Sequence, residues 1–314
     1  MKVIRGIPPA TDWTPCALTI GNFDGVHRGH QALLKKLVAK AKALQVQSCV
    51  MTFEPHPIEY FAPEKAPARI LGLRDKLEAL AEIGIDQVLV IHFNQAFANL
   101  SPEAFVKDIL VDGLKVKSIL IGDDFHYGAK RAGNFSDLQI AGQQFGFSVE
   151  RMETLVEDQE RISSSAIRLA LQNGQMDRAQ QLLGRPYMLS GHVLHGQKLG
   201  RTLGFPTLNL AVANRLHKRK PAAQGIFIAQ VHGLSDNPLP AVASQGVAFG
   251  SAIARSLYAT TVFEPFSKTV TLSSCDVFFA QVSGSASIAS ELTVIECDAS
   301  KRESSPACGV MSVG

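Results

Sequence analysis

Two histidines in the segment GNFDGVHRGH have the type and spacing that phosphate binding requires. The segment spans residues 21–30 and places His27 and His30 three positions apart. At the start of a helix, side chains three apart lie about one turn from each other and can reach one anionic group together. The free N–H groups and the positive dipole end of a helix start favour the same ligand. These residues therefore suit binding of a phosphate group and stabilisation of its developing negative charge.

The flanking residues predict the elements that must position this segment. Residues 17–20 (ALTI) are apolar and partly β-branched, which is typical of a buried strand. The apolar residues that follow have helical spacing, and they are Leu33, Leu34, Leu37, Val38, Ala41 and Leu44. The segment is thus a strand-to-helix turn whose glycines allow close backbone approach to a ligand. The alternative is a tight turn with Asp24 as helix cap and two solvated histidines.

Strands and helices alternate through the first half of the chain. The predicted strands are residues 17–22, 48–53, 87–93, 118–122 and 147–151, and the predicted helices are residues 30–44, 74–83, 102–111, 136–145 and 165–173. Apolar strands that alternate with amphipathic helices indicate a parallel sheet covered on both faces. Ligands bind at the carboxyl ends of the strands in such sheets, so the motifs after the strands are expected at one edge.

Three further motifs lie after predicted strands or at a helix start. Residues 121–134 (IGDDFHYGAKRAGN) combine aromatic rings with cations, which suits a flat heteroaromatic ligand that carries a phosphate. Residues 161–168 (RISSSAIR) offer hydroxyl groups, free N–H groups and an arginine as a second phosphate site. Two prolines stiffen residues 52–57 (TFEPHP), where the ligand crevice should open. A surface loop, an over-capped helix and a rigid turn are the respective alternatives.

The chain changes character after residues 183–187 (LGRPY), where a glycine and a proline predict a domain boundary. Residues 190–210 hold repeated glycines around two basic side chains, which allows close approach to a polyphosphate. Thr207 and Asn209 alternate on one face and can supply oxygen ligands to Mg²⁺. A Gly-rich hairpin with a solvated basic face is the alternative.

Taken together, the motifs resemble those of the bacterial bifunctional riboflavin kinase/FAD synthetase family. Residues 21–30 are similar to its version of the HxGH motif of nucleotidyltransferases, and residues 52–57 are similar to a loop beside the flavin. Residues 121–134 are similar to its DFxFGxxRxGN loop, with His126 and Tyr127 where Arg and Phe are expected.

Two more motifs extend the resemblance along the chain. Residues 161–168 are similar to the ISSTxIR motif, with Ser165 in place of Thr. Residues 190–210 are similar to the opening of the riboflavin kinase domain, including its PTxN motif at residues 206–209. The five motifs stand in the family's order.

The resemblance implies a fold, a domain organisation and two activities. Residues 1–185 are expected to form an α/β, Rossmann-like HxGH nucleotidyltransferase domain with a parallel sheet, and residues 186–314 a smaller, incomplete antiparallel β-barrel. The first domain is expected to transfer the adenylyl group of ATP to FMN, giving FAD and pyrophosphate. The second is expected to phosphorylate riboflavin to FMN with ATP, and Mg²⁺ is the implied cofactor.

The resemblance also implies which residues form the sites. The catalytic residues are His27, His30 and Arg168, and the residues that bind ATP for adenylyl transfer are Gly21, Asn22, Phe23, Gly29, Ser164 and Ser165. The flavin-binding residues are Phe53, Pro55, His56, Pro57, Asp124, Phe125, Tyr127, Arg131 and Asn134. The ATP-binding residues of the kinase are Gly196, Lys198, Gly200 and Arg201, and its metal ligands are Thr207 and Asn209.

From about residue 245 the family pattern is not recognisable. The strand expected to supply the glutamate base of the kinase is not recognisable, and Glu264, the carboxylate nearest to the expected position, is not assigned as that base. A shifted reading frame near codon 245 is our hypothesis, and a divergent tail is the alternative. We therefore expect weak or absent kinase activity.

Composition excludes several classes of function. A net charge of +3 without a concentrated basic face argues against a nucleic-acid partner, and no apolar run approaches the length of a membrane span. The five cysteines form no CxxC pair, which favours a reducing cytoplasm over a disulfide framework or a zinc site. Cys49 is expected to be a small core residue.

Two other classes of function remain open at this point. One is a different HxGH nucleotidyltransferase, against which the loops at residues 52–57 and 121–134 argue. The other is a non-catalytic flavin-binding protein. The oligomeric state does not follow from the sequence.

Overall fold

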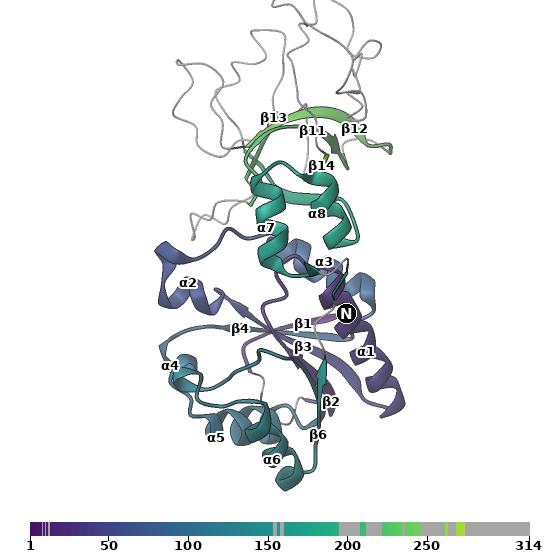
Figure 1. The fold of residues 1–314 in the computed structure, drawn as a ribbon. Coiled ribbons are helices and arrows are strands. Elements are labelled where there is room, and N and C mark those ends of the chain that lie inside the picture. The colour runs from purple at the N-terminus through teal and green to yellow at the C-terminus, as the bar shows by residue number, and fades with distance from the viewer. Residues whose placement is uncertain are drawn as a thin grey trace, which may run out of the picture.

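The computed structural model describes residues 1–7, 9, 11, 13–152, 156–157, 160–194, 208–211, 222–233, 236–245, 261–262 and 268–273. These residues form two six-stranded sheets, a small two-stranded sheet and the helices that pack around them (Figure 1). We call the part of the chain up to α8 the first module and the part from β9 onward the second module.

A six-stranded parallel sheet forms the centre of the first module. In spatial order its strands are β1 (Lys2–Arg5), β4 (Gln87–His92), β3 (Gln47–Glu54), β2 (Cys16–Ile20), β5 (Val116–Gly122) and β6 (Ser148–Met152). The five predicted strands are confirmed within two residues at each end. The edge strand β1 was not predicted, because its four residues are largely exposed and show no buried apolar run.

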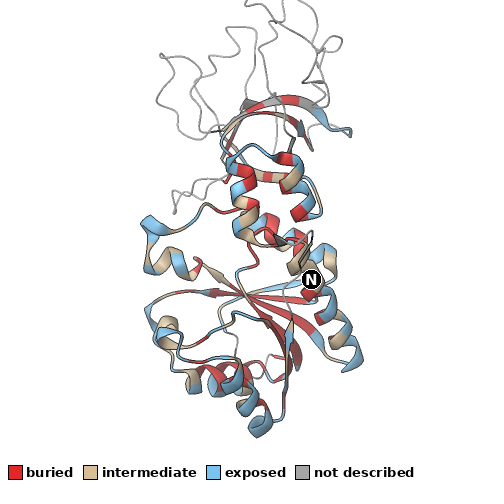
Figure 2. Cartoon of the chain, in the orientation of Figure 1, coloured by how far each residue is buried: buried red, intermediate tan, exposed pale blue. Residues whose placement is uncertain are grey.

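Helices cover both faces of this sheet, as the apolar pattern predicts. Ala17 of β2 belongs to a buried cluster that includes residues of α1 (Arg28–Ala43), α3 (Leu73–Ile83), α7 (Ser164–Gln172) and α8 (Met176–Leu183). Its neighbour Leu18 belongs to a second cluster, with η3 (Phe105–Gly113) and α6 (Phe135–Phe145). Figure 2 shows the strands between these layers as buried and the outer helix faces as exposed.

Short elements fill the connections of the first module. They are α2 (Pro57–Phe61), η2 (Pro63–Lys65), α4 (Gln95–Ala98), α5 (Pro102–Ala104), η4 (Ala129–Arg131), β7 (Val156–Glu157) and β8 (Glu160–Arg161). Ser101 caps α5 by accepting a hydrogen bond from Ala104 N at 3.1 Å, which confirms the predicted helix start. The predicted helix over residues 102–111 is an α-helix only as far as Ala104, and from Phe105 it continues as the π-helix η3.

The second module contains a six-stranded antiparallel sheet. In spatial order its strands are β12 (Leu239–Gln245), β11 (Gly225–Val231), β14 (Lys268–Ser273), β9 (Tyr187–Leu194), β10 (Leu208–Ala211) and β13 (Thr261–Val262). The edge strands β12 and β13 also contact each other. Strands β13 and β14 lie beyond residue 245, and β14 pairs with both β11 and β9. The sequence shows no recognisable family strand after residue 245, but the structure forms these two strands there.

One apolar core runs through both modules. The buried cluster that contains Ala17 and Leu34 continues through Leu183 and Tyr187 to Phe227 and Ala243 of the second sheet. Helix α8 contacts β9 and β14, and Figure 1 shows α7 and α8 between the two sheets. The modules are therefore packed against each other rather than joined by an open linker.

Candidate active site

The segment with the two histidines, residues 21–30, connects β2 to α1 and is called the histidine loop below. His27 is the N-cap of α1, and its Nδ1 accepts a hydrogen bond from the backbone N–H of His30 at 3.3 Å. The two imidazole rings stack with their centroids 3.6 Å apart, and the edge of Phe23 contacts His30. The prediction that a helix start brings both histidines together is confirmed.

Both histidines are neutral near pH 7. Burial, followed by the positive charges of Arg161 and Arg185, lowers the pKa of His27 to about 4. Burial also holds the pKa of His30 well below its ordinary value, and repulsion from His27, when that residue is protonated, and from Lys76 adds to this effect. Because Nδ1 of neutral His27 accepts a hydrogen bond, its proton lies on Nε2, which is then a donor.

One nitrogen of this pair lacks a protein partner. Among the residues that the structure describes, the buried Nδ1 of His30 has no hydrogen-bond partner. A buried polar atom without a partner is costly, so such an atom at a ligand site indicates a group that binds there. The solvated-histidine alternative is wrong, since His27 is only 6% exposed.

The alternative interpretation of the turn made Asp24 a helix cap, but Asp24 has a different role in the structure. Its carboxylate accepts hydrogen bonds from the backbone N–H groups of Ile70 and Leu71. It also accepts one from Nη2 of Arg168 at 2.6 Å, and Arg168 Nε donates to the carbonyl oxygen of Ala68. The buried Asp24 therefore joins the histidine loop to the chain before α3 and to α7.

Carbonyl groups of the histidine loop are bound by side chains from several other elements. Thr52 Oγ1 donates to the carbonyl oxygen of Asn22 at 3.3 Å, and Ser164 Oγ donates to that of Asp24 at 2.8 Å. This contact places Ser164 beside the loop at the start of α7. Ser165, the next residue, is exposed at the same helix start.

Lys76 is a residue of this site that sequence reasoning missed. Its ammonium group is fully buried on α3 and lies 3.1 Å from Nε2 of His56 and 3.4 Å from Oγ1 of Thr52. Burial first, and then the charge of Arg69, lowers the pKa of Lys76 to about 8. The available signal was that Lys76 lies on the apolar face of an amphipathic helix. A lysine is ordinarily expected to be exposed to solvent, so this signal is easily passed over.

The TFEPHP loop is held by ion pairs. Arg69, itself buried, binds both Glu54 and Glu59. Glu59 also accepts a hydrogen bond from the backbone N–H of His56, the N-cap of α2, at 2.8 Å. His56 thus faces Lys76 inside the protein, while Pro57 begins α2. The peptide bond between Glu54 and Pro55 is cis.

Aromatic rings gather between this loop and the loop over residues 121–134. Phe53 contacts Phe93 and Phe97, while Tyr127 contacts Phe105 and stacks on Phe125. Further rings of this group are Tyr60 and Phe61, which the sequence analysis did not single out. The two rings lie three and four residues after Pro57, and this closeness to the proline motif is a signal that could have found them.

The polar residues of the second loop have protein partners. Arg131 lies 3.3 Å from Nδ1 of His126, and Asp124 pairs with Arg161 at 3.5 Å across an exposed surface. The side chain of Asn134 caps α6, where Oδ1 accepts from Ser136 N and Asp137 N. The roles of Asp124, Arg131 and Asn134 toward a flavin remain predictions.

The predicted kinase residues fall largely outside the described part of the chain. Gly196, Lys198, Gly200, Arg201, Thr207 and Glu264 are not described, and Asn209 is described only as a backbone position in β10, paired with Leu194. Within the described residues, no group of three or more His, Cys, Asp or Glu side chains could hold a metal ion. The assignments of these residues therefore remain predictions.

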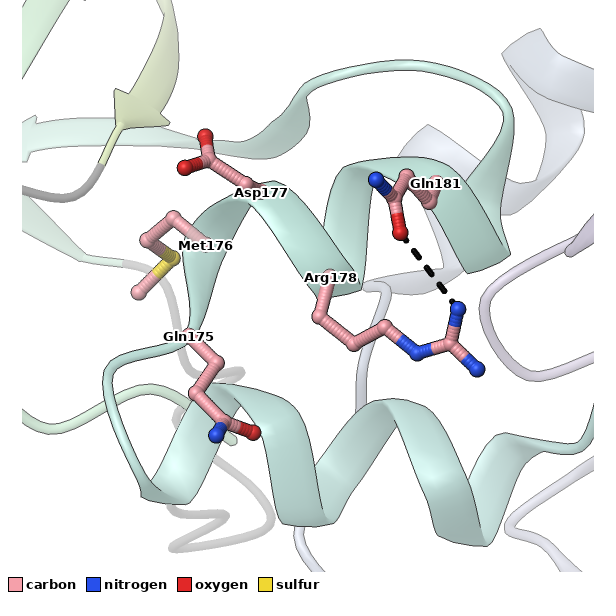
Figure 3. A pocket seen from close by; sticks show the side chains of 5 residues that line it. All are labelled: Gln175, Met176, Asp177, Arg178 and Gln181. Carbon is pink, nitrogen blue, oxygen red and sulfur yellow. Dashed lines mark hydrogen bonds between the residues drawn. The ribbon is translucent and has the colours of Figure 1, made fainter. Parts of the chain in front are cut away.

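A hollow of about 570 Å³ on α8 is separate from the predicted site. Gln175, Met176, Asp177, Arg178 and Gln181 line it, and none of them belongs to a predicted motif (Figure 3). Arg178 donates to Gln181 within the same helix. The hollow contains neither the stacked histidines nor the aromatic rings, so it does not define the active site.

Comparison with known families agrees with this geometry. The sequence model of the FAD synthetase family matches residues 10–166, and that of the riboflavin kinase family matches residues 183–282. A bifunctional riboflavin kinase/FMN adenylyltransferase from Escherichia coli K12 is 46% identical over 248 residues, which is 78% of each chain. The chain belongs to the bifunctional riboflavin kinase/FMN adenylyltransferase family. The kinase match continues past residue 245, where the motifs stop being recognisable.

Other members of the family are similarly related. The protein from Haemophilus influenzae is 45% identical over 247 residues, covering 78% of this chain and 79% of its own. The protein from Pseudomonas fluorescens is 46% identical over 248 residues, covering 79% and 78%.

A solved structure described as a macrolide-efflux protein from Streptococcus pneumoniae shares the fold. Its TM-score is 0.69 at 25% identity, and the match covers 91% of this chain and 94% of that one. That description concerns the other protein. In the described part of this chain, no helix has the length and apolar character needed to cross a bilayer.

Proposed function

We propose that the first module transfers the adenylyl group of ATP to FMN, producing FAD and pyrophosphate. The observation that carries this proposal is the stacked, neutral pair His27 and His30 at the start of α1, with Nδ1 of His30 buried and without a partner among the described residues. The pair lies after a parallel strand, at the sheet edge where such folds bind ligands. Membership of the family supplies the identity of the two substrates.

The reaction requires no covalent enzyme intermediate. An oxygen of the FMN phosphate attacks the α-phosphorus of ATP, forming one P–O bond. The bond between the α-phosphorus and the bridging oxygen to the β-phosphate breaks, and pyrophosphate leaves with that electron pair. Negative charge builds on the α-phosphoryl oxygens and on the leaving group, so catalysis consists of positioning and electrostatic stabilisation.

The histidine loop is assigned to the phosphates of ATP. His27 Nε2 carries a proton and can donate it in a hydrogen bond, because its Nδ1 is occupied by the N–H of His30. The negative charge of an approaching polyphosphate raises the pKa of both histidines, because it opposes the neighbouring cations that help to lower those pKa values. Gly21, Asn22, Phe23 and Gly29 complete the proposed nucleotide site.

Residues at the start of α7 are assigned to the leaving pyrophosphate. Ser164 already contacts the histidine loop through the carbonyl oxygen of Asp24, and Ser165 is exposed beside it. Arg168 lies about one turn further and holds Asp24. Its cationic charge close to the loop supports its proposed role in stabilising the transition state.

The aromatic rings beside the TFEPHP loop are assigned to the isoalloxazine ring of the flavin. Phe53 and Phe125 are half-buried, while Tyr127 and His56 are buried. Flat rings favour stacking with a heteroaromatic ligand. Pro55 and Pro57 shape the same loop.

Mg²⁺ is proposed to bind together with the phosphates of ATP. The described side chains offer no metal cluster of their own, and the predicted ligands Thr207 and Asn209 belong to the kinase. When bound, Mg²⁺ would neutralise phosphate charge, and the steps above use side chains of the protein alone.

The second module is proposed to be the riboflavin kinase of the family, which transfers the γ-phosphoryl group of ATP to riboflavin. The antiparallel sheet and the contact between its edge strands β12 and β13 support the predicted barrel. Its glutamate base is not identified, so a low rate remains our expectation.

One incubation tests both activities. The protein is mixed with ATP and Mg²⁺ and either FMN or riboflavin, and the flavins are separated while pyrophosphate is measured. FAD with equimolar pyrophosphate from FMN is the expected result. A protein that binds flavin but releases no pyrophosphate would support the non-catalytic alternative, and adenylylation of another mononucleotide in place of FMN would support a different HxGH enzyme.

A further inference from the structure

The segment after α8 is bound directly to the histidine loop. Arg185 Nη2 donates to the carbonyl oxygen of Gly25 at 2.7 Å, and its Nη1 donates to that of Val26 at 3.1 Å. Nη1 also lies 3.4 Å from the carbonyl oxygen of Leu183. A single guanidinium group therefore binds two consecutive carbonyl groups of the loop and one of its own segment.

A second side chain, that of Gln31, binds at the same junction. Gln31 Nε2 in α1 donates to the carbonyl oxygens of Val26 and Leu183, at 2.9 and 2.7 Å. Arg185 and Gln31 thus share both acceptors. The carbonyl groups of Gly25 and Val26 are oriented by side chains rather than by regular secondary structure.

The loop at this point has a backbone that needs such support. Phe23 and Val26 have φ of 48° and 41°, and Gly25 has φ of 90°. Positive φ in residues other than glycine is strained, and it persists only where surrounding contacts enforce it. Arg185 binds the carbonyl groups of two of these three residues, immediately before His27.

Arg185 lies between the two modules, after the end of α8 and before the start of β9, and within the part of the chain that the riboflavin kinase model matches. The FAD synthetase match ends at residue 166 and the riboflavin kinase match begins at residue 183. Two residues after Arg185, Tyr187 begins β9, the strand that pairs with β14. Further along β9, Ser190 donates a hydrogen bond to Asp75 of α3.

We propose that Arg185 is a positioning residue for adenylyl transfer, supplied by the junction to the second module, and that it fixes the geometry of the Gly25–Val26 peptide and so of His27. This inference rests on the proposed function of the first module. Arg185 acts through the loop backbone and has no assigned contact with substrate. The planar fork of arginine is required, because a lysine ammonium at the same place can bind one carbonyl group well but not two in fixed orientation.

Adenylyl transfer and the state of His27 test the proposal in the full chain. Variants R185M and R185K are compared with R178M, which removes an arginine of α8 that donates to Gln181 of the same helix. We expect R185M to lower kcat/KM for FAD formation by about 10²-fold, the order expected when a reacting group is misplaced by about 1 Å. R185K should recover part of that loss, and R178M should match the parent protein.

The pKa of His27, measured by NMR, separates the effect of the positive charge of Arg185 from the effect of its fixed geometry. The positive charge of Arg185 contributes to the low pKa of His27, so R185M should raise it while R185K, which keeps the charge, should not. Rates are measured well below the melting temperature of each variant, so a loss of stability alone leaves them unchanged. R185K provides a folded variant if R185M does not fold.

The outcomes separate the two proposals. If the parent protein makes no FAD from ATP and FMN, the proposed function is wrong. The positioning role of Arg185 is wrong if the parent protein makes FAD and folded R185M keeps a rate within twofold of the parent rate. Where R185M does not fold, the same criterion applies to R185K.

Discussion

Arg168 donates a 2.6 Å hydrogen bond to the carboxylate of Asp24 and thereby joins α7 to the histidine loop. The exposed fractions of the two side chains are 16% and 3%, so the ion pair is shielded from water. Two backbone N–H groups share the same carboxylate. Removing Arg168 therefore removes this ion pair and leaves backbone N–H groups to stabilise the buried negative charge of Asp24.

We expect the Arg168→Met substitution to lower the free energy of unfolding by about 3–5 kcal/mol, the usual cost of breaking a buried ion pair on one side. Urea unfolding of the parent and variant proteins measures this difference. The double variant D24N/R168M should be more stable than R168M, because the uncompensated charge is removed as well. A change below about 1 kcal/mol in R168M would show that the pair is not structurally important.

The His30→Ala substitution should lower the rate of FAD formation by about 10²-fold or more, the usual order for removing one donor that stabilises transition-state charge. The variant should fold, since the surface of His30 as a whole is only half-buried. The matched control is His192→Ala on β9, an exposed histidine of the second module. Near-normal turnover of H30A would refute the catalytic role.

Stability should fall as the pH falls from about 6.5 to about 4, because of His27. Its pKa is 6.5 in the unfolded chain and about 4 in the folded protein. Between these values the unfolded state binds more protons, so protonation favours unfolding and stability increases with pH. The contribution of His27 alone is about 3 kcal/mol.

Urea unfolding at several pH values checks this prediction. A His27→Asn variant, which cannot be protonated, should show a shallower dependence over the same interval. An equally steep curve for H27N would assign the effect to other groups.

The Lys76→Met substitution should destabilise the TFEPHP loop, because His56 and Thr52 lose the ammonium group that contacts both. We expect a loss of about 1–3 kcal/mol, the cost of leaving buried polar atoms unpaired. It should also raise the pKa of His30, since the charge of Lys76 helps to lower it. Urea unfolding and histidine NMR measure the two effects, with Lys36→Met on α1 as an exposed control.

Kinase activity should be weak or absent, because no glutamate base is recognisable after residue 245. Formation of FMN from riboflavin and ATP measures it directly, and ordinary enzyme rates would contradict the prediction. Sequencing the gene around codon 245 tests the separate hypothesis of a shifted reading frame. A clean frame that encodes the same tail would leave divergence as the explanation.

The sequence by itself determined much of the first module. Apolar periodicity predicted the central strands and the helices that cover them, since both patterns arise within a single element. The spacing of His27 and His30 predicted that their side chains lie together, because the local geometry of a helix brings residues three apart onto the same face. The order of the motifs after the predicted strands indicated that the histidine loop and the loops at residues 52–57 and 121–134 lie at one sheet edge.

Only the tertiary structure decided which groups support the histidine loop. Arg168 and Asp24 are 144 positions apart, and Arg185 and Gly25 are 160 positions apart. No periodicity links such residues, because they meet through the packing of α7, α8 and the parallel sheet. Lys76 shows the same limit, since its burial depends on what packs against α3 rather than on its place in the helix. The short strands β1 and β13 depend likewise on pairing partners distant in sequence.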